Sequence, residues 1–131
     1  MKRKCKHIAS SKNRKKSVYI DEDNSEEILN YIRQDTRHLK KFQYILEIIL
    51  EGHRNPELYD KEDINSRCKD VTSMKFFKGQ ENDRIYCKEI TTDKGEFIVV
   101  ASILHLKKKT QKNSKIEKTI IEKVGGYKYE F

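Results

Sequence analysis

At 131 residues the chain is long enough to form one domain with its own hydrophobic core, without support from disulfides or bound metal. Its three cysteines, Cys5, Cys68 and Cys87, share no short spacing, which argues against a disulfide framework and against a zinc site. No apolar stretch approaches the roughly 20 residues of a membrane span, and the first residues lack the apolar core of a secretory signal. We therefore expect a cytoplasmic protein that does not contact a membrane.

The net charge of +8 is concentrated at the start of the chain. Residues 1–16 contain eight lysines and arginines and no acid, so the rest of the chain is neutral overall. A basic segment with so little apolar content is typical of disorder, and we predict a disordered arm over 1–16 and a folded domain over 17–131. Such an arm either binds RNA or the ribosome by releasing counterions, or serves only as a solubilising tail.

The first half of the folded domain predicts a strand followed by two helices. Ser17–Ile20 has strand character, and Asn24 with Glu27 forms a capping box at the start of a helix. A second periodic apolar run begins near Asp35 and ends at Gly52, where a glycine is favoured after the last helical turn. We interpret the pair as a helical hairpin, or one long bent helix, that covers one face of a sheet.

The second half predicts three strands and a short helix. After a loop over 53–70, the segments 71–77, 84–92 and 97–105 have strand character, and short turns between them indicate an antiparallel meander. A helix over 114–124 and an extended aromatic arm complete the chain. The predicted fold is therefore α+β, a small antiparallel sheet covered by an N-terminal helical hairpin, with a short C-terminal helix.

A cluster of basic residues follows the most apolar strand. The run from Phe97 is unbroken enough to be buried on both faces, and it leads into His105, Lys107, Lys108, Lys109 and Lys112. Positive charge where a strand leaves the core predicts a surface that binds a polyanion or an acidic partner. Alternatively, the lysines form a solvated connection and His105 is a hydrogen-bonded structural residue.

Three short motifs in order resemble the RelE/ParE toxin superfamily, its HigB-like branch in particular. They are Met74-Lys75, Arg84-Ile85-Tyr86, and the run Leu106-Lys107-Lys108-Lys109-Thr110-Gln111-Lys112 before a helix. The match covers about residues 71–124, and the preceding strand and two helices agree with the family in order and length. Lys75 stands where the family usually has arginine, which offers phosphate a bidentate fork that lysine lacks.

The resemblance implies a RelE-like fold and a type II toxin, a metal-independent endoribonuclease without a cofactor that cleaves mRNA, usually on the ribosome. It also implies a cognate antitoxin, which should present an acidic segment to the basic surface. Cleavage by the 2′-OH of the RNA needs a base, an acid and positive charge at phosphorus, usually the largest contribution. The candidate catalytic residues are Arg84, Lys75, His105, Lys108 and Tyr127; the candidate RNA-binding residues are Lys107, Lys109, Lys112, Lys88 and Tyr129.

Two other functions stay open at this point. A non-catalytic RNA- or DNA-binding module would use the same basic residues without cleavage, and Lys75 in place of arginine favours it. A ParE-like inhibitor would act on a protein such as gyrase, against which the basic exit of the last strand argues mildly. For Arg84 the alternative is a structural ion pair with Glu81 or Asp83.

Overall fold

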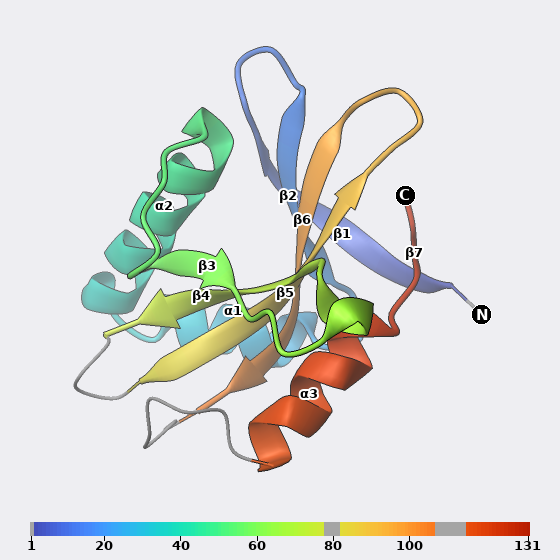
Figure 1. The fold of residues 1–131 in the computed structure, drawn as a ribbon. Helices are drawn as coiled ribbons and strands as arrows, with labels where there is room; N and C mark the ends of the chain where they lie inside the picture. The colour runs from blue at the N-terminus through green and yellow to red at the C-terminus, as the bar shows by residue number, and fades with distance from the viewer. Residues whose placement is uncertain (1, 78–81, 107–114) are drawn as a thin grey trace.

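The computed structural model describes residues 2–77, 82–106 and 115–131. Along this part of the chain, two strands precede two helices, and further strands and a third helix follow, so the fold is α+β (Figure 1). The elements are β1 (Arg3–Ser10), β2 (Lys16–Asp21), α1 (Ser25–Arg33), α2 (Thr36–Glu51), β3 (Tyr59–Lys61), the 3₁₀ turn η1 (Ser66–Cys68), β4 (Val71–Phe76), β5 (Asp83–Thr91), β6 (Phe97–His105), α3 (Lys115–Gly125) and β7 (Tyr129–Glu130).

The described strands form one mixed sheet in the order β3-β4-β5-β6-β2-β1-β7. β4, β5 and β6 are an antiparallel meander, as the sequence predicted, and β6 then pairs in parallel with β2. β2 and β1 are an antiparallel hairpin, and β7 adds to β1 in parallel. The sheet curls, so that its two halves face different directions (Figure 1).

The predicted small antiparallel sheet under an N-terminal helical hairpin was wrong. Within the described residues the sheet has seven strands and two parallel pairings, and the β1–β2 hairpin precedes both helices. The sequence pattern missed this because the parallel pairing of β2 with β6 joins segments far apart along the chain, such as Ile20 and Ala101. Nothing in either strand alone specifies which neighbour it will have.

The predicted disordered arm was also wrong, because most of it is strand β1. Backbone hydrogen bonds form on both sides of it: residues 5–10 pair with β2, and Arg3 and Lys4 pair with β7. Two of its few apolar side chains, Cys5 and Ile8, add contacts with the hydrophobic clusters. The Arg3 side chain adds an ion pair with Asp21, with Nε 2.7 Å from Oδ2. Low apolar content therefore led to a prediction of disorder for a segment that is ordered as a strand by its neighbours.

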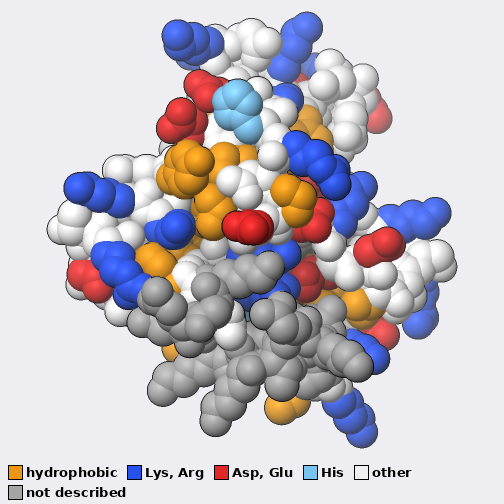
Figure 2. All heavy atoms as spheres, turned by 60° about the vertical axis from the view of Figure 1, so that its left-hand side comes forward, with side chains coloured by type: hydrophobic (Ala, Val, Ile, Leu, Met, Phe, Trp, Pro, Cys, Tyr) orange, Lys and Arg blue, Asp and Glu red, His pale blue; other side chains and the backbone are white. Residues whose placement is uncertain are grey.

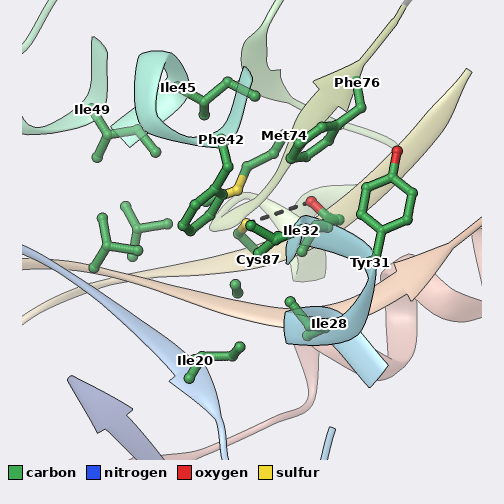
Figure 3. Packing of buried hydrophobic residues seen from close by; sticks show 14 residues of the cluster. Ile20, Ile28, Tyr31, Ile32, Phe42, Ile45, Ile49, Met74, Phe76 and Cys87 are labelled. Carbon is green, nitrogen blue, oxygen red and sulfur yellow. Dashed lines mark hydrogen bonds between the residues drawn. The ribbon is translucent and has the colours of Figure 1, made fainter. Parts of the chain in front are cut away.

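Helices α1 and α2 pack against one face of the sheet and form the main core with it (Figure 3). Ile28 and Ile32 of α1 and Ile45 of α2 are buried against β-strand residues such as Met74. Their helical spacing is what the sequence predicted. The main core thus lies between the helices and the sheet.

The two helices differ in how their ends are capped. Asp35 caps α2 by accepting a hydrogen bond from the backbone N–H of His38 at 2.8 Å, and Gly52 ends that helix at φ +73°. The predicted capping box of α1 was wrong: Asn24 stands at the N-cap, but its side chain donates to the carbonyl of Ser102 instead. Asn24 therefore ties the helix start to β6.

The opposite face of the sheet is covered unevenly. α3 packs over β4, β5 and β6, with Ile121 and Val124 buried against Tyr86. A smaller cluster of Ile98, Val100 and Tyr129 lies farther along β6. In Figure 1 α3 lies at the end of the sheet away from the tip of the β1–β2 hairpin. We call the whole sheet face opposite α1 and α2 the α3 face.

The predicted loop over 53–70 contains two short elements, β3 and η1. β3 extends the sheet at its edge beside β4, with Tyr59 opposite Met74. The polar composition hid this strand because it is short and lies at an edge, where few of its side chains are buried. Within the described ranges, none of the helices has both the length and the apolar character to span a membrane.

Candidate functional site

Three of the predicted catalytic residues lie in one row across the sheet. Lys75 of β4 is directly opposite Arg84 of β5, and Arg84 is directly opposite His105 of β6. Directly opposed residues of antiparallel strands point to the same face. The register therefore places all three side chains on the α3 face, at the end of the sheet next to the segments 78–81 and 107–114.

The Arg84 side chain is held by a carboxylate that follows β3. Its Nη1 donates to both oxygens of Glu62 at 3.1 Å, and the two side chains are 11% and 4% exposed. Ser73 donates a further hydrogen bond to Glu62 at 3.2 Å. Arg84 makes no other hydrogen bond with the described residues, so its Nε and Nη2 are not committed within them. The alternative pairing with Asp83 is not what the structure has, and Glu81 lies outside the described residues.

Tyr86 is buried next to this ion pair and is unusual in its hydrogen bonding. Its side chain is fully buried, and its hydroxyl has no hydrogen-bond partner among the described residues. Burial raises the pKa of Tyr86, and the nearby charge of Glu62 raises it further. The phenol therefore keeps its proton at neutral pH and remains a hydrogen-bond donor. A buried donor without a partner is rare in folded proteins and often marks a functional position.

His105 lies on the other side of Arg84, between Tyr86 and helix α3. Its Nε2 is 4.0 Å from the carboxylate of Glu117, and its ring lies 6.4 Å from that of Tyr86. The imidazole side chain is 23% exposed, whereas Glu117 is buried. His105 is therefore the more accessible member of a cluster whose other members are held inside. We call Glu62, Arg84, Tyr86, His105 and Glu117 the Glu-Arg-His cluster.

The chemistry of this cluster is that of proton transfer beside a positive charge. A carboxylate such as Glu62 can accept a proton, an imidazolium such as His105 can donate one, and the guanidinium between them can stabilise negative charge. Histidine is the side chain suited to exchange protons near neutral pH. The Tyr86 hydroxyl adds a neutral donor at the same place. No group of metal-ligating side chains occurs in the part of the chain that the structure describes.

Lys75 lies at the rim of the cluster rather than within it. Its Nζ donates to the carbonyl of Pro56 at 2.9 Å, and its backbone N–H donates to Leu58. The side chain therefore helps hold the segment before β3, while its charge stays in the same row as Arg84. The predicted residues Lys107, Lys108, Lys109 and Lys112 lie outside the described residues, so their roles stay predictions.

The other predicted residues have structural contacts away from the cluster. Lys88 donates to the carbonyls of Gly125 and Tyr127 at 2.7 and 2.6 Å, which ties β5 to the end of α3. Tyr129 is buried and donates to Asp21 at 2.6 Å, and the Tyr127 ring lies under the guanidinium of Arg3 at 4.0 Å. The structure thus does not bring Lys88, Tyr127 or Tyr129 to Arg84.

Sequence reasoning missed Glu62 and Glu117. Glu62 follows a strand that was predicted as loop, and no pattern in its polar surroundings distinguishes it. Glu117 lies in the first turn of α3 and shares a helical stripe with Ile121 and Val124, at i+4 and i+7. An acid on the buried stripe of an amphipathic helix is a signal that could have found it.

Figure 2 shows Lys and Arg side chains spread over this side of the molecule, with Asp and Glu side chains among them. A hollow of about 670 Å³ lies elsewhere, between the β1–β2 turn and the end of α2, lined by residues such as Lys12, Lys16 and Glu47. Its lining mixes basic and acidic groups without a buried titratable cluster. The Glu-Arg-His cluster is therefore the better candidate for chemistry, because its members are positioned by the sheet register and by burial.

Comparisons with protein-family models, with curated proteins and with solved structures found no match.

Proposed function

We propose that this protein is a metal-independent endoribonuclease that cleaves RNA at the Glu-Arg-His cluster. The observation that supports this best is the row formed by Lys75, Arg84 and His105, with Glu62 held on Arg84. It combines a base, an acid and positive charge on one face. The resemblance to RelE-like toxins in the same residues supports RNA as the substrate.

In the proposed reaction Glu62 removes the proton from a ribose 2′-OH, and the 2′ oxygen attacks the adjacent phosphorus. The bond from phosphorus to the 5′ oxygen breaks, and His105 gives its proton to that leaving oxygen. The products are a 2′,3′-cyclic phosphate and a 5′-hydroxyl. Arg84 and Tyr86 donate hydrogen bonds to the phosphoryl oxygens, whose negative charge increases in the transition state.

The Arg84 contact with Glu62 is compatible with this role. Only Nη1 is engaged by Glu62. Nε and Nη2 form the edge of the guanidinium that holds a phosphate with two parallel hydrogen bonds. The ion pair thus orients the arginine from one side while the other side receives the phosphate. On the α3 side, the Glu117 carboxylate lies 4.0 Å from Nε2 of His105.

The test is cleavage of a labelled RNA by Glu62→Gln and by His105→Gln, in EDTA, with and without ribosomes. Each change roughly keeps the size and polarity of the side chain but removes its proton transfer, and Glu62→Gln keeps one oxygen that can accept from Arg84. We expect each to lower the cleavage rate by about 10²- to 10⁴-fold, the usual contribution of a general acid or base. Glu26→Gln and His53→Gln, at exposed positions of the same residue types, are the matched controls and should cleave like the wild type.

The expected products identify the mechanism, since the 2′-OH route leaves cyclic phosphate and a metal-dependent hydrolase does not. Wild-type protein that cleaves no RNA in either condition would overturn the proposal. Full activity in both variants would overturn the assignment of the cluster.

A non-catalytic nucleic-acid-binding protein is the second candidate. The observation in its favour is that Glu62 occupies part of Arg84 and lies close enough to repel a phosphate. This function predicts RNA binding that weakens steeply with salt, without any change in RNA length.

The biological setting that we propose is a cytoplasmic toxin-antitoxin pair. The toxin would cleave mRNA on the ribosome, and an antitoxin with an acidic segment would cover the basic residues around the cluster. Growth after induced expression, compared between wild type and Glu62→Gln, tests this. Arrest in the wild type alone is the expected outcome.

A further inference from the structure

The half of the α3 face that α3 does not cover carries a row of aromatic side chains. His7 of β1 is directly opposite Tyr19 of β2, so both rings point to the same side of the sheet. Tyr19 packs against the small cluster of Ile98, Val100 and Tyr129. The row therefore rests on apolar side chains from β6 and β7.

The rings contact one another edge to face and remain open on the outside. The ring centroids of His7 and Tyr19 are 5.2 Å apart, and those of Tyr19 and Phe131 are also 5.2 Å apart. Phe131 is 56% exposed, His7 is exposed and Tyr19 is half-buried. We call these three residues the aromatic platform. Large apolar rings left uncovered side by side indicate a surface that binds something.

The charges of the β1–β2 hairpin, which carries two of the platform rings, indicate the kind of partner. Residues 2–16, which include β1 and the turn into β2, carry eight lysines and arginines and no acid. Lys12, Arg14 and Lys15 are exposed in the turn, where Lys12 and Lys15 also line the hollow against the end of α2. The backbone of the turn is ordered by its own hydrogen bonds, with the backbone N–H of Ser11 donating to Lys16 at 2.8 Å. Flat rings and a basic turn on the same hairpin favour a flexible polyanion that has flat groups of its own and extends from the platform to the turn.

We propose that the aromatic platform binds single-stranded RNA by stacking bases on Tyr19 and Phe131, while the hairpin holds the backbone phosphates. Aromatic side chains on a sheet surface bind unpaired bases in this way, and basic residues along the path add salt-dependent affinity. The choice of RNA over DNA rests on the proposed function. The platform would then hold a part of the substrate away from the cleaved bond.

The experiment measures binding of a fluorescein-labelled 12-nucleotide oligo(A) RNA with 2′-O-methyl riboses, which cannot be cleaved by 2′-OH attack. Phe131→Leu and Tyr19→Leu remove the stacking surface but keep apolar contact with the sheet. Each should raise the dissociation constant about tenfold, within the usual range for loss of one stacked base. Tyr44→Leu, at an exposed tyrosine of α2, is the matched control and should bind like the wild type.

Salt dependence separates the two parts of the surface. Phe131→Leu should weaken binding equally at all salt concentrations, because stacking releases no counterions. The double variant Lys12→Ala/Lys15→Ala should lower the slope of log affinity against log salt by up to about two, about one for each phosphate that is no longer neutralised. Circular dichroism of every variant checks that the fold is intact.

Three outcomes would overturn the proposal or part of it. Unchanged affinity in both platform variants, or equal loss in Tyr44→Leu, would exclude the platform, whatever the cleavage assay shows. Tighter binding of the DNA oligonucleotide of the same sequence would exclude RNA as its partner. A protein that binds through the platform but cleaves no RNA would instead overturn only the proposed endoribonuclease.

Discussion

Two buried arginine–carboxylate pairs lie at opposite ends of the sheet, and they differ in how completely they are satisfied. Asp21 receives hydrogen bonds from Arg3 at 2.7 and 3.0 Å, from the Tyr129 hydroxyl at 2.6 Å and from the backbone N–H of Asn24 at 3.1 Å. Among the described residues, Glu62 receives only one nitrogen of Arg84, at 3.1 Å to each oxygen, and one hydroxyl. Tyr86 beside it donates to none of the described residues.

This difference in hydrogen bonding indicates that the Asp21 pair is a structural network and that the Glu62 pair belongs to a candidate site. A buried carboxylate with short hydrogen bonds on both oxygens stabilises one arrangement, and the Asp21 network joins β1, β2 and β7 in this way. A buried cluster that keeps spare donors holds its polar groups at a cost in stability, which is typical of positions that receive a ligand. Comparing equal substitutions at the two ends tests this interpretation.

The largest effect is expected at Asp21. Asp21→Ala removes the buried acceptor of Arg3, Tyr129 and the Asn24 backbone N–H, which leaves Tyr129 with Ser102 and Arg3 with the exposed Asp23. Because Arg3 is 25% exposed, we expect a cost of about 3 kcal/mol, the lower end of the range for breaking a buried pair. Urea unfolding followed by circular dichroism measures the loss. Asp23→Ala is the control, because Asp23 is 77% exposed and lies 3.5 Å from the same arginine. It should cost less than about 1 kcal/mol, and an equal loss in both variants would contradict the structural role of Asp21.

Smaller effects on the free energy of unfolding are expected when Tyr129 or Tyr86 is changed to phenylalanine, and the two variants should differ. Tyr129→Phe removes a hydrogen bond to a buried carboxylate and should cost about 1.5–3 kcal/mol of unfolding free energy. Tyr86→Phe removes a hydroxyl without a partner among the described residues, so stability should stay within about 0.5 kcal/mol of the wild type or rise. If Tyr86 contacts the phosphate, RNA cleavage should fall in Tyr86→Phe and not in Tyr129→Phe.

The paired result is decisive because both variants make the same chemical change. A clear loss of stability in Tyr86→Phe would mean that its hydroxyl has a structural partner, and the contrast between the two ends would fail.

The smallest expected effect is a loss of stability at alkaline pH caused by Tyr86 and Tyr129. Burial raises the pKa of both Tyr86 and Tyr129 above the usual value near 10. The folded state therefore keeps protons that the unfolded state loses, so stability is fully present below about pH 10 and falls as pH rises above it. Each phenylalanine variant should show a shallower fall between about pH 10 and 11, measured by urea midpoints. A fall as steep as in the wild type would show that these phenols do not cause it.

Local patterns predicted most individual elements correctly. The apolar periods of α1 and α2, the glycine after α2 and the Gly95 turn between β5 and β6 act over a few residues, so they are visible in the sequence. β1 and the edge strand β3 were missed because strands with mostly polar side chains depend on their neighbours' backbones. Of the residues predicted for the site, Lys75, Arg84 and His105 lie in one row, while Lys88, Tyr127 and Tyr129 lie elsewhere.

The sequence by itself determined where the chain is apolar, where helices begin and end, and that positive charge gathers at its start. Only the tertiary structure decided that Glu62 meets Arg84, that Glu117 meets His105 and that Tyr129 meets Asp21. The physical reason is distance along the chain. Caps, turns and periodic stripes arise between residues a few positions apart, whereas these contacts join residues 12 to 108 positions apart and depend on strand order and register.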